Sequence, residues 1–234
     1  MTEAFSCRMV PSIDANRSVK DALSAAIGSY RFRSRISATD LLSPMQTFHN
    51  RTYPKIRPSP DRLQIMMAGT GFHEILDHII SSEEYLEQLL ETDGIVGKVD
   101  IYEDILVEIK TTSSIPADIY KGRSSYFEQL GMYCAMAEKE EGRLFVYQRH
   151  KNERPTELKV YEAIFTNLRR VKEQMLSRRD FFQDALECKD SSRLPQCEWI
   201  YRSCDYSSVC PCRARVPAQA ILQSDQVEFE KCLR

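Results

Sequence analysis

The chain has 234 residues, of which 42% are hydrophobic and 28% charged, a balance typical of a globular protein with a substantial core. Its formal net charge of -2 at pH 7 excludes a surface coated with positive charge, so any contact with nucleic acid must come from a local groove or patch. The amino terminus lacks a basic stretch followed by a long apolar run, and no window is apolar for long enough to cross a bilayer, so we expect an intracellular, cytoplasmic protein without a membrane partner.

The first part of the chain, residues 1–68, is expected to form an amino-terminal helical segment and no separate domain. Residues 19–32 are compatible with a short helix, and residues 35–44 (RISATDLLSP) combine a cap with a helix start. The proline-rich stretch 50–64 predicts a loop that ends this helix.

Residues 69–91 predict an amphipathic helix. Apolar residues recur at helical spacing between Phe72 and Ile80, glycines precede this pattern, and Gly94 follows it.

Alternating hydrophobicity over residues 94–112 predicts two strands joined near Glu103 and Asp104. The periodicity then predicts a helix over 124–140, strands over 142–150 and 157–166, and a helix over 167–187. This order indicates an α/β core over 69–187, with a mixed central sheet flanked by helices. A cysteine-rich segment over 188–234 completes what we expect to be one integrated domain.

Three charged residues on the two predicted strands suggest a chemical site. Asp100 closes the first strand, and Glu108 and Lys110 leave the same face of the second. If the strands pair, Asp100 and Glu108 come close diagonally, and two carboxylates in one space repel unless a cation lies between them. Carboxylates and the carbonyl oxygen of Ile109 would suit Mg²⁺ or Mn²⁺. Alternating Glu and Lys are also typical of a solvated strand face.

Residues on the neighbouring helices give this site its context. His73 lies near the start of the predicted helix, beside Gly69, although a lone histidine there is often only a hydrogen-bonded surface group. Gln129 and Tyr133 are four residues apart on one face of the next helix and offer amide and phenol groups to a phosphate or a base.

The ordered set GTGFH, VDIYEDILVEIKTT and QLGMY resembles the PD-(D/E)XK nuclease superfamily of the RecB kind. Its motifs run G-x-x-x-H, D, E-x-K and Q-x-x-x-Y, and they fall here on Gly69, His73, Asp100, Glu108, Lys110, Gln129 and Tyr133. The resemblance implies a restriction-endonuclease-like core. It also implies that His73, Asp100 and Glu108 are metal ligands, that Asp100, Glu108 and Lys110 are catalytic, and that Gln129 and Tyr133 contact DNA.

The cysteines gather in the last quarter of the chain, which in an intracellular protein favours metal or cluster ligation over disulfides. The stretch from Cys197 to Cys212 has the spacing C-x6-C-x5-C-x-C. Four thiolates this close fit an iron–sulfur cluster or zinc, and the absence of two C-x2-C pairs favours the cluster. Cys134 is more simply explained as a small buried residue.

This carboxy-terminal segment also resembles the iron–sulfur segment of RecB-like nucleases such as CRISPR-associated exonucleases, AddB and exonuclease V. The resemblance implies three carboxy-terminal ligands, Cys197, Cys204 and Cys210, and one ligand ahead of the core. The usual early cysteine is missing after residues 36–42, so the fourth ligand is open among Cys7, Cys212 and Cys188.

We therefore expect a Mg²⁺- or Mn²⁺-dependent DNA nuclease with a 4Fe-4S cluster. By resemblance, it would be an exonuclease or endonuclease acting on single strands or DNA ends, with partners in CRISPR adaptation, recombination or repair. Candidates for base stacking are Tyr126, Phe127 and Tyr133. The alternatives are a non-catalytic DNA-binding or assembly subunit that keeps the nuclease fold, and a zinc protein whose acidic strand pair is only a solvated face.

Overall fold

The computed structural model describes residues 35–56, 58–149, 156–195, 197 and 204–210. The short helix expected over 19–32 lies outside these residues, as do Cys7 and Cys212. Within the described ranges, no helix combines the length and the apolar character needed to span a bilayer.

A six-stranded mixed sheet forms the centre of the molecule. β3 (Ile95–Tyr102) pairs along one edge with β2 (Leu86–Thr92), and its opposite edge is shared by β4 (Leu106–Thr112) and β1 (Ile36–Ser37). β4 pairs in parallel with β5 (Glu141–Gln148), and β5 pairs with the antiparallel β6 (Glu157–Ile164). The expected mixed central sheet is confirmed.

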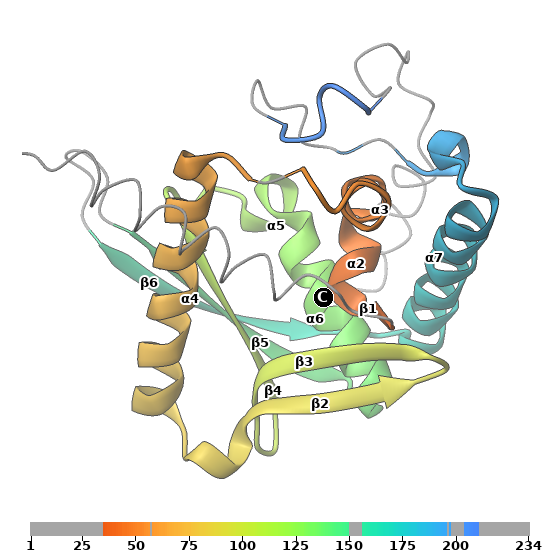
Figure 1. Ribbon diagram of the computed structural model, residues 1–234. Helices are drawn as coiled ribbons and strands as arrows, with labels where there is room; N and C mark the ends of the chain where they lie inside the picture. Colours follow the sequence, from red (N-terminus) through yellow and green to blue (C-terminus); the bar gives the residue numbers. More distant parts are fainter. Residues whose placement is uncertain (1–34, 57, 150–155, 196, 198–203, 211–234) are drawn as a thin grey trace, which may run out of the picture.

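Helices cover both faces of the sheet (Figure 1). In chain order they are α2 (Ala38–Leu42), α3 (Pro44–Thr52), α4 (Pro60–Ile80), α5 (Ile119–Gly122), α6 (Ser124–Ala137) and α7 (Leu168–Cys188). Short 3-10 turns, η1 (Glu83–Tyr85) and η2 (Ser191–Arg193), follow α4 and α7.

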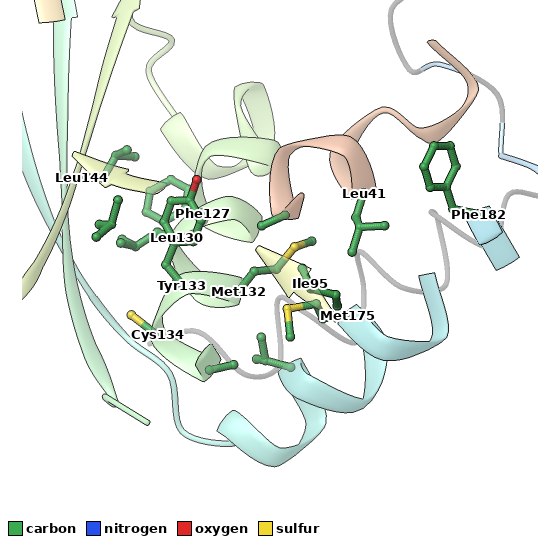
Figure 2. Close-up of a cluster of buried hydrophobic side chains, with 14 of the residues drawn as sticks. Leu41, Ile95, Phe127, Leu130, Met132, Tyr133, Cys134, Leu144, Met175 and Phe182 are labelled. Atoms are coloured by element: carbon green, nitrogen blue, oxygen red, sulfur yellow. The ribbon is translucent and has the colours of Figure 1, made fainter. Parts of the chain in front are cut away.

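The main core lies between the sheet and α6, with α2, α3 and α7 around it (Figure 2). α6 packs so closely on the sheet that a Cβ atom added to Gly97 would lie 2.7 Å from the Tyr133 ring. Glu128 of α6 and Arg178 of α7 form a buried ion pair at 2.7 Å. Met45, from the predicted amino-terminal segment, and Tyr206, from the cysteine-rich segment, belong to the same cluster of buried residues. The described parts of all three predicted segments therefore share one core.

α4 covers the other face of the sheet. Phe72 stacks on Tyr147 of β5 with ring centroids 3.8 Å apart, and a Cβ atom at Gly69 would lie 3.5 Å from the Thr111 hydroxyl of β4. Gly69 therefore lies inside the helix, where the helix approaches the sheet. Beneath α4 the sheet contributes a separate small cluster of buried residues, Ile101, Val107 and Ile109.

The predicted elements are confirmed from β3 to α7 and at the Ser37 cap, where Ser37 and Asp40 form a capping box. The helix predicted over 69–91 is wrong at both ends. It begins at Pro60, since proline is well suited to a first helical position, so the loop predicted over 50–64 is shorter. It ends at Ile80, and residues 86–92 form β2 because pairing with β3 overrides the helix propensity of their Leu and Glu residues.

Candidate active site

The candidate site lies where β3 and β4 separate. The two strands pair only at Ile101 with Val107 and at Tyr102 with Leu106. Asp100 lies just beyond this pairing, two residues before β3 ends, and its Oδ2 accepts a hydrogen bond of 2.6 Å from the backbone N–H of Ile109. A side chain thus replaces a missing backbone bond and fixes the Asp100 carboxylate between the strands.

β2, the strand on the other side of Asp100, has a distorted backbone. Glu87 of β2 has a φ of 53°, in the left-handed region, and it interrupts an otherwise regular ladder between Leu86 and Gln88. Its side chain forms an exposed ion pair of 2.5 Å with Lys98. Strained backbone of this kind often accompanies functional sites. The sequence contains no turn residue at Glu87 that would have indicated the distortion.

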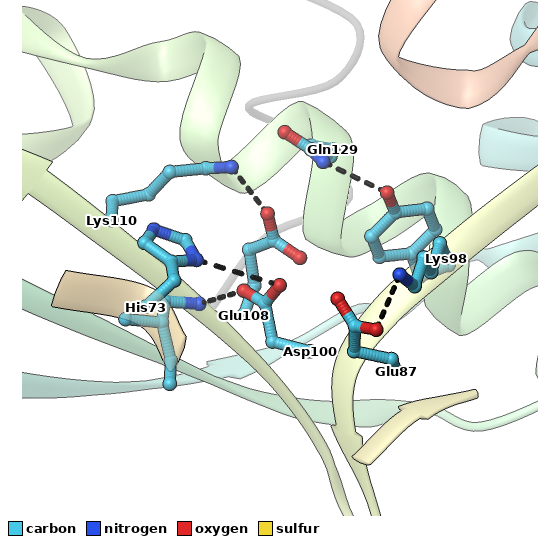
Figure 3. A network of polar contacts seen from close by, with 9 residues as sticks. His73, Glu87, Lys98, Asp100, Glu108, Lys110 and Gln129 are labelled. Atoms are coloured by element: carbon cyan, nitrogen blue, oxygen red, sulfur yellow. Dashed lines mark hydrogen bonds and ion pairs between the residues drawn. The ribbon is translucent and has the colours of Figure 1, made fainter. Parts of the chain in front are cut away.

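Glu108 and Lys110 extend from β4 toward α6 and form an ion pair (Figure 3). Glu108 is 2% exposed, and its Oε2 atom is buried without a hydrogen-bond partner. Burial raises the pKa of Glu108 to about 7, against the opposing effect of Lys110. Burial lowers the pKa of Lys110, but the negative charges of Glu108 and Asp100 outweigh it and keep the pKa raised. The pair therefore places a charged ammonium beside a carboxylate whose Oε2 atom can still bind a ligand.

His73 reaches the same place from α4. Its Nδ1 lies 3.6 Å from Oδ1 of Asp100. Burial lowers the pKa of His73, but the contact with Asp100 outweighs it, so the net shift is upward. The structure thus brings together His73, Asp100, Glu108 and Lys110, the residues that the sequence assigned to metal binding and catalysis.

Gln129 and Tyr133 pair with each other on α6. The Gln129 amide donates a hydrogen bond of 2.8 Å to the Tyr133 hydroxyl, and burial raises the pKa of Tyr133 to about 12. Tyr133 is 2% exposed and Phe127 4%, so the burial of both rings argues against their stacking on a base. Tyr126 is only partly buried, and the Lys110 ammonium lies 5.9 Å from its ring centroid.

The donor set fits a hard divalent cation, because it contains carboxylates, an imidazole and a buried carboxylate oxygen without a partner. As they stand, the described residues include no group of three His, Cys, Asp or Glu side chains close enough to hold a metal ion. Glu108 instead contacts Lys110, and Asp100 contacts the backbone of β4.

The predicted cluster ligands are only partly within the described residues. Cys210 is buried, and Cys197 and Cys204 line one cavity. Cys188 is exposed at the end of α7, with its thiol 3.8 Å from Asp184. Cys134 is buried as expected, and burial raises its pKa to about 12. The cluster stays a prediction.

Comparison with solved structures shows a related fold. The crystal structure of SSO0001 matches with a TM-score of 0.53 and 18% identity, over 85% of this chain and 96% of that chain. The crystal structure of an alkaline exonuclease (LHK-Exo) from Laribacter hongkongensis matches with a TM-score of 0.41 and 16% identity, over 72% of this chain and 93% of that chain. No family model and no curated protein matches the sequence. The first likeness, at this low identity, shows a shared fold alone.

Proposed function

We propose that this protein is a metal-dependent nuclease that hydrolyses phosphodiester bonds of DNA. The observation that carries the proposal is the meeting of Asp100, Glu108 and Lys110 at the separation of two strands, with a buried Glu108 oxygen that has no partner. A buried carboxylate oxygen without a partner is costly unless it has a ligand to bind.

His73, Asp100, Glu108 and the carbonyl oxygen of Ile109 would hold Mg²⁺ or Mn²⁺. Such a cation supplies a charge that polarises a phosphoryl oxygen and lowers the pKa of bound water. Lys110 is held in place by Glu108 with its side chain 19% exposed, so its ammonium can face a phosphate or a water molecule. Its positive charge would stabilise the negative charge that develops on the phosphate during cleavage.

The finer assignments rest on the sequence motifs. They are exonuclease action on single-stranded DNA or DNA ends, a 4Fe-4S cluster held by Cys197, Cys204 and Cys210 with a fourth cysteine, and a role in CRISPR adaptation, recombination or repair. Iron and sulfide analysis of protein purified without oxygen tests the cluster. Zinc without iron would favour the zinc alternative.

The activity is tested with end-labelled single- and double-stranded DNA and Mn²⁺. The wild type is expected to degrade DNA, and Lys110→Ala to lower the rate at least about 100-fold, the usual effect of removing one charge-stabilising group. Lys121→Ala is the matched control, because the Lys121 side chain is 77% exposed on α5. An unchanged rate in Lys110→Ala contradicts the mechanism. DNA binding without turnover in the wild type favours the non-catalytic alternative.

A further inference from the structure

A cavity of about 730 Å³ opens beside the candidate active site. Its walls come from α2, α3, the first turns of α4, and α6, and Lys110 and Gln129 belong to its lining. Cys197 and Cys204 line it as well. The cavity therefore places the proposed catalytic lysine in contact with a space built mostly by residues outside the motifs.

The charged groups of this lining already have partners. Asp40 contacts Arg51 at 2.8 Å, Arg62 contacts Asp205 at 2.9 Å, and Lys110 contacts Glu108. The other polar groups are neutral hydroxyls and amides, such as those of Ser43, Gln46, Thr47, Ser59 and Ser125. A lining of this kind suits a ligand with neutral hydrogen-bonding edges better than one with several phosphates.

An aromatic ring stands where the cavity meets the catalytic residues. Tyr126 lines the cavity, is partly buried, and lies beside Lys110. A partly exposed ring offers a stacking surface to any base, whatever its sequence.

The volume limits the form of the ligand. It falls within the ~300–1,000 Å³ typical of small-ligand sites. A space of this size suits an unpaired nucleotide better than a B-form duplex, whose major groove alone is ~12 Å wide.

We propose that this cavity is a nucleotide subsite that binds one strand next to the phosphodiester bond to be cleaved. Bases stack on Tyr126 and form hydrogen bonds with the hydroxyls and amides of the wall, while the adjoining phosphate lies at Lys110. The inference rests on the proposed nuclease function, and it assigns the expected preference for single strands to residues of α2, α3 and α6 that belong to no motif.

Filling the cavity tests this subsite. Thr47 lines the cavity from α3, whereas Thr52 is exposed at the end of the same helix, so Thr47→Phe is compared with Thr52→Phe. Binding of fluorescein-labelled hexathymidine is measured by anisotropy with Ca²⁺ in place of Mn²⁺. Thr47→Phe is expected to raise Kd at least about fivefold, the smallest change when one base loses its stacking surface, and Thr52→Phe to leave Kd unchanged. Ile65→Trp, at a 58% exposed lining position, replaces Thr47→Phe if that variant does not fold.

A minimal substrate separates the subsite from the catalytic centre. Hydrolysis of bis(p-nitrophenyl) phosphate needs no neighbouring nucleotide, so Thr47→Phe should keep it within about twofold while losing kcat/KM on the oligonucleotide. Equal loss on both substrates, or unchanged hexathymidine binding, overturns the subsite. A wild type that hydrolyses neither substrate overturns the nuclease function, and the binding comparison then still decides the subsite.

Discussion

The two faces of the sheet are built differently. On the face of α6, buried residues form one continuous core that joins α2, α3, α6 and α7, and Leu130 is fully buried in it. On the face of α4, the buried cluster is small, and the apolar side chains of Ile75 and Ile79 are 61% and 73% exposed. The expected apolar face of this helix is thus only partly covered in the structure.

The proposed site takes residues from both faces of the sheet. Glu108 and Lys110 are fixed by the strand that is packed under α6, whereas His73 comes from the sparsely packed α4. The well-packed face therefore holds the pair proposed to be catalytic, and a less buried helix supplies the remaining proposed ligand. Precise placement is most easily maintained on well-packed elements.

The largest expected effect on stability is on the α6 face. Leu130→Ala removes a fully buried side chain that packs against Gly142 of β5, and it should lower the free energy of unfolding by about 2–5 kcal/mol. Urea denaturation followed by circular dichroism measures the change. A loss below about 1 kcal/mol would show that this face is not the main core.

A much smaller effect is expected on the α4 face. Ile75→Ala removes a side chain that is 61% exposed, so the free energy of unfolding should change by no more than about 0.5 kcal/mol. The same denaturation experiment applies. A loss as large as that of Leu130→Ala would contradict the comparison and indicate that Ile75 is buried in solution by another surface.

Local patterns in the sequence were sufficient for most of the fold. Strand alternation located β3 and β4, and helical periodicity located α6 and α7, because these elements bury regular stripes of residues. β2 was missed because its Leu and Glu residues favour a helix, and only pairing with β3 makes it a strand. The sequence pattern does not indicate the close approach of Gly69 to β4, because this is a contact between distant segments.

The same distinction between local patterns and contacts of distant segments applies to the candidate site. The order of the motifs identified Asp100, Glu108 and Lys110, since their spacing on two adjacent strands fixes their positions. Spacing alone did not show that Tyr133 is buried or that Glu87 distorts the strand beside Asp100. The sequence does not predict the cavity, because residues such as Thr47 come to line one space with Lys110 only through the packing of helices distant in sequence.

The central claim is that His73, Asp100 and Glu108 form a cation site, and Mn²⁺ binding followed by electron paramagnetic resonance tests it most directly. The wild type should bind Mn²⁺, and Glu108→Gln should weaken this binding at least about tenfold, because the loss of even an outer-shell partner commonly has that effect. Glu91→Gln is the control, because Glu91 is exposed on β2 and pairs with Arg35. Equal Mn²⁺ affinity in the wild type and Glu108→Gln would contradict the assignment of the site.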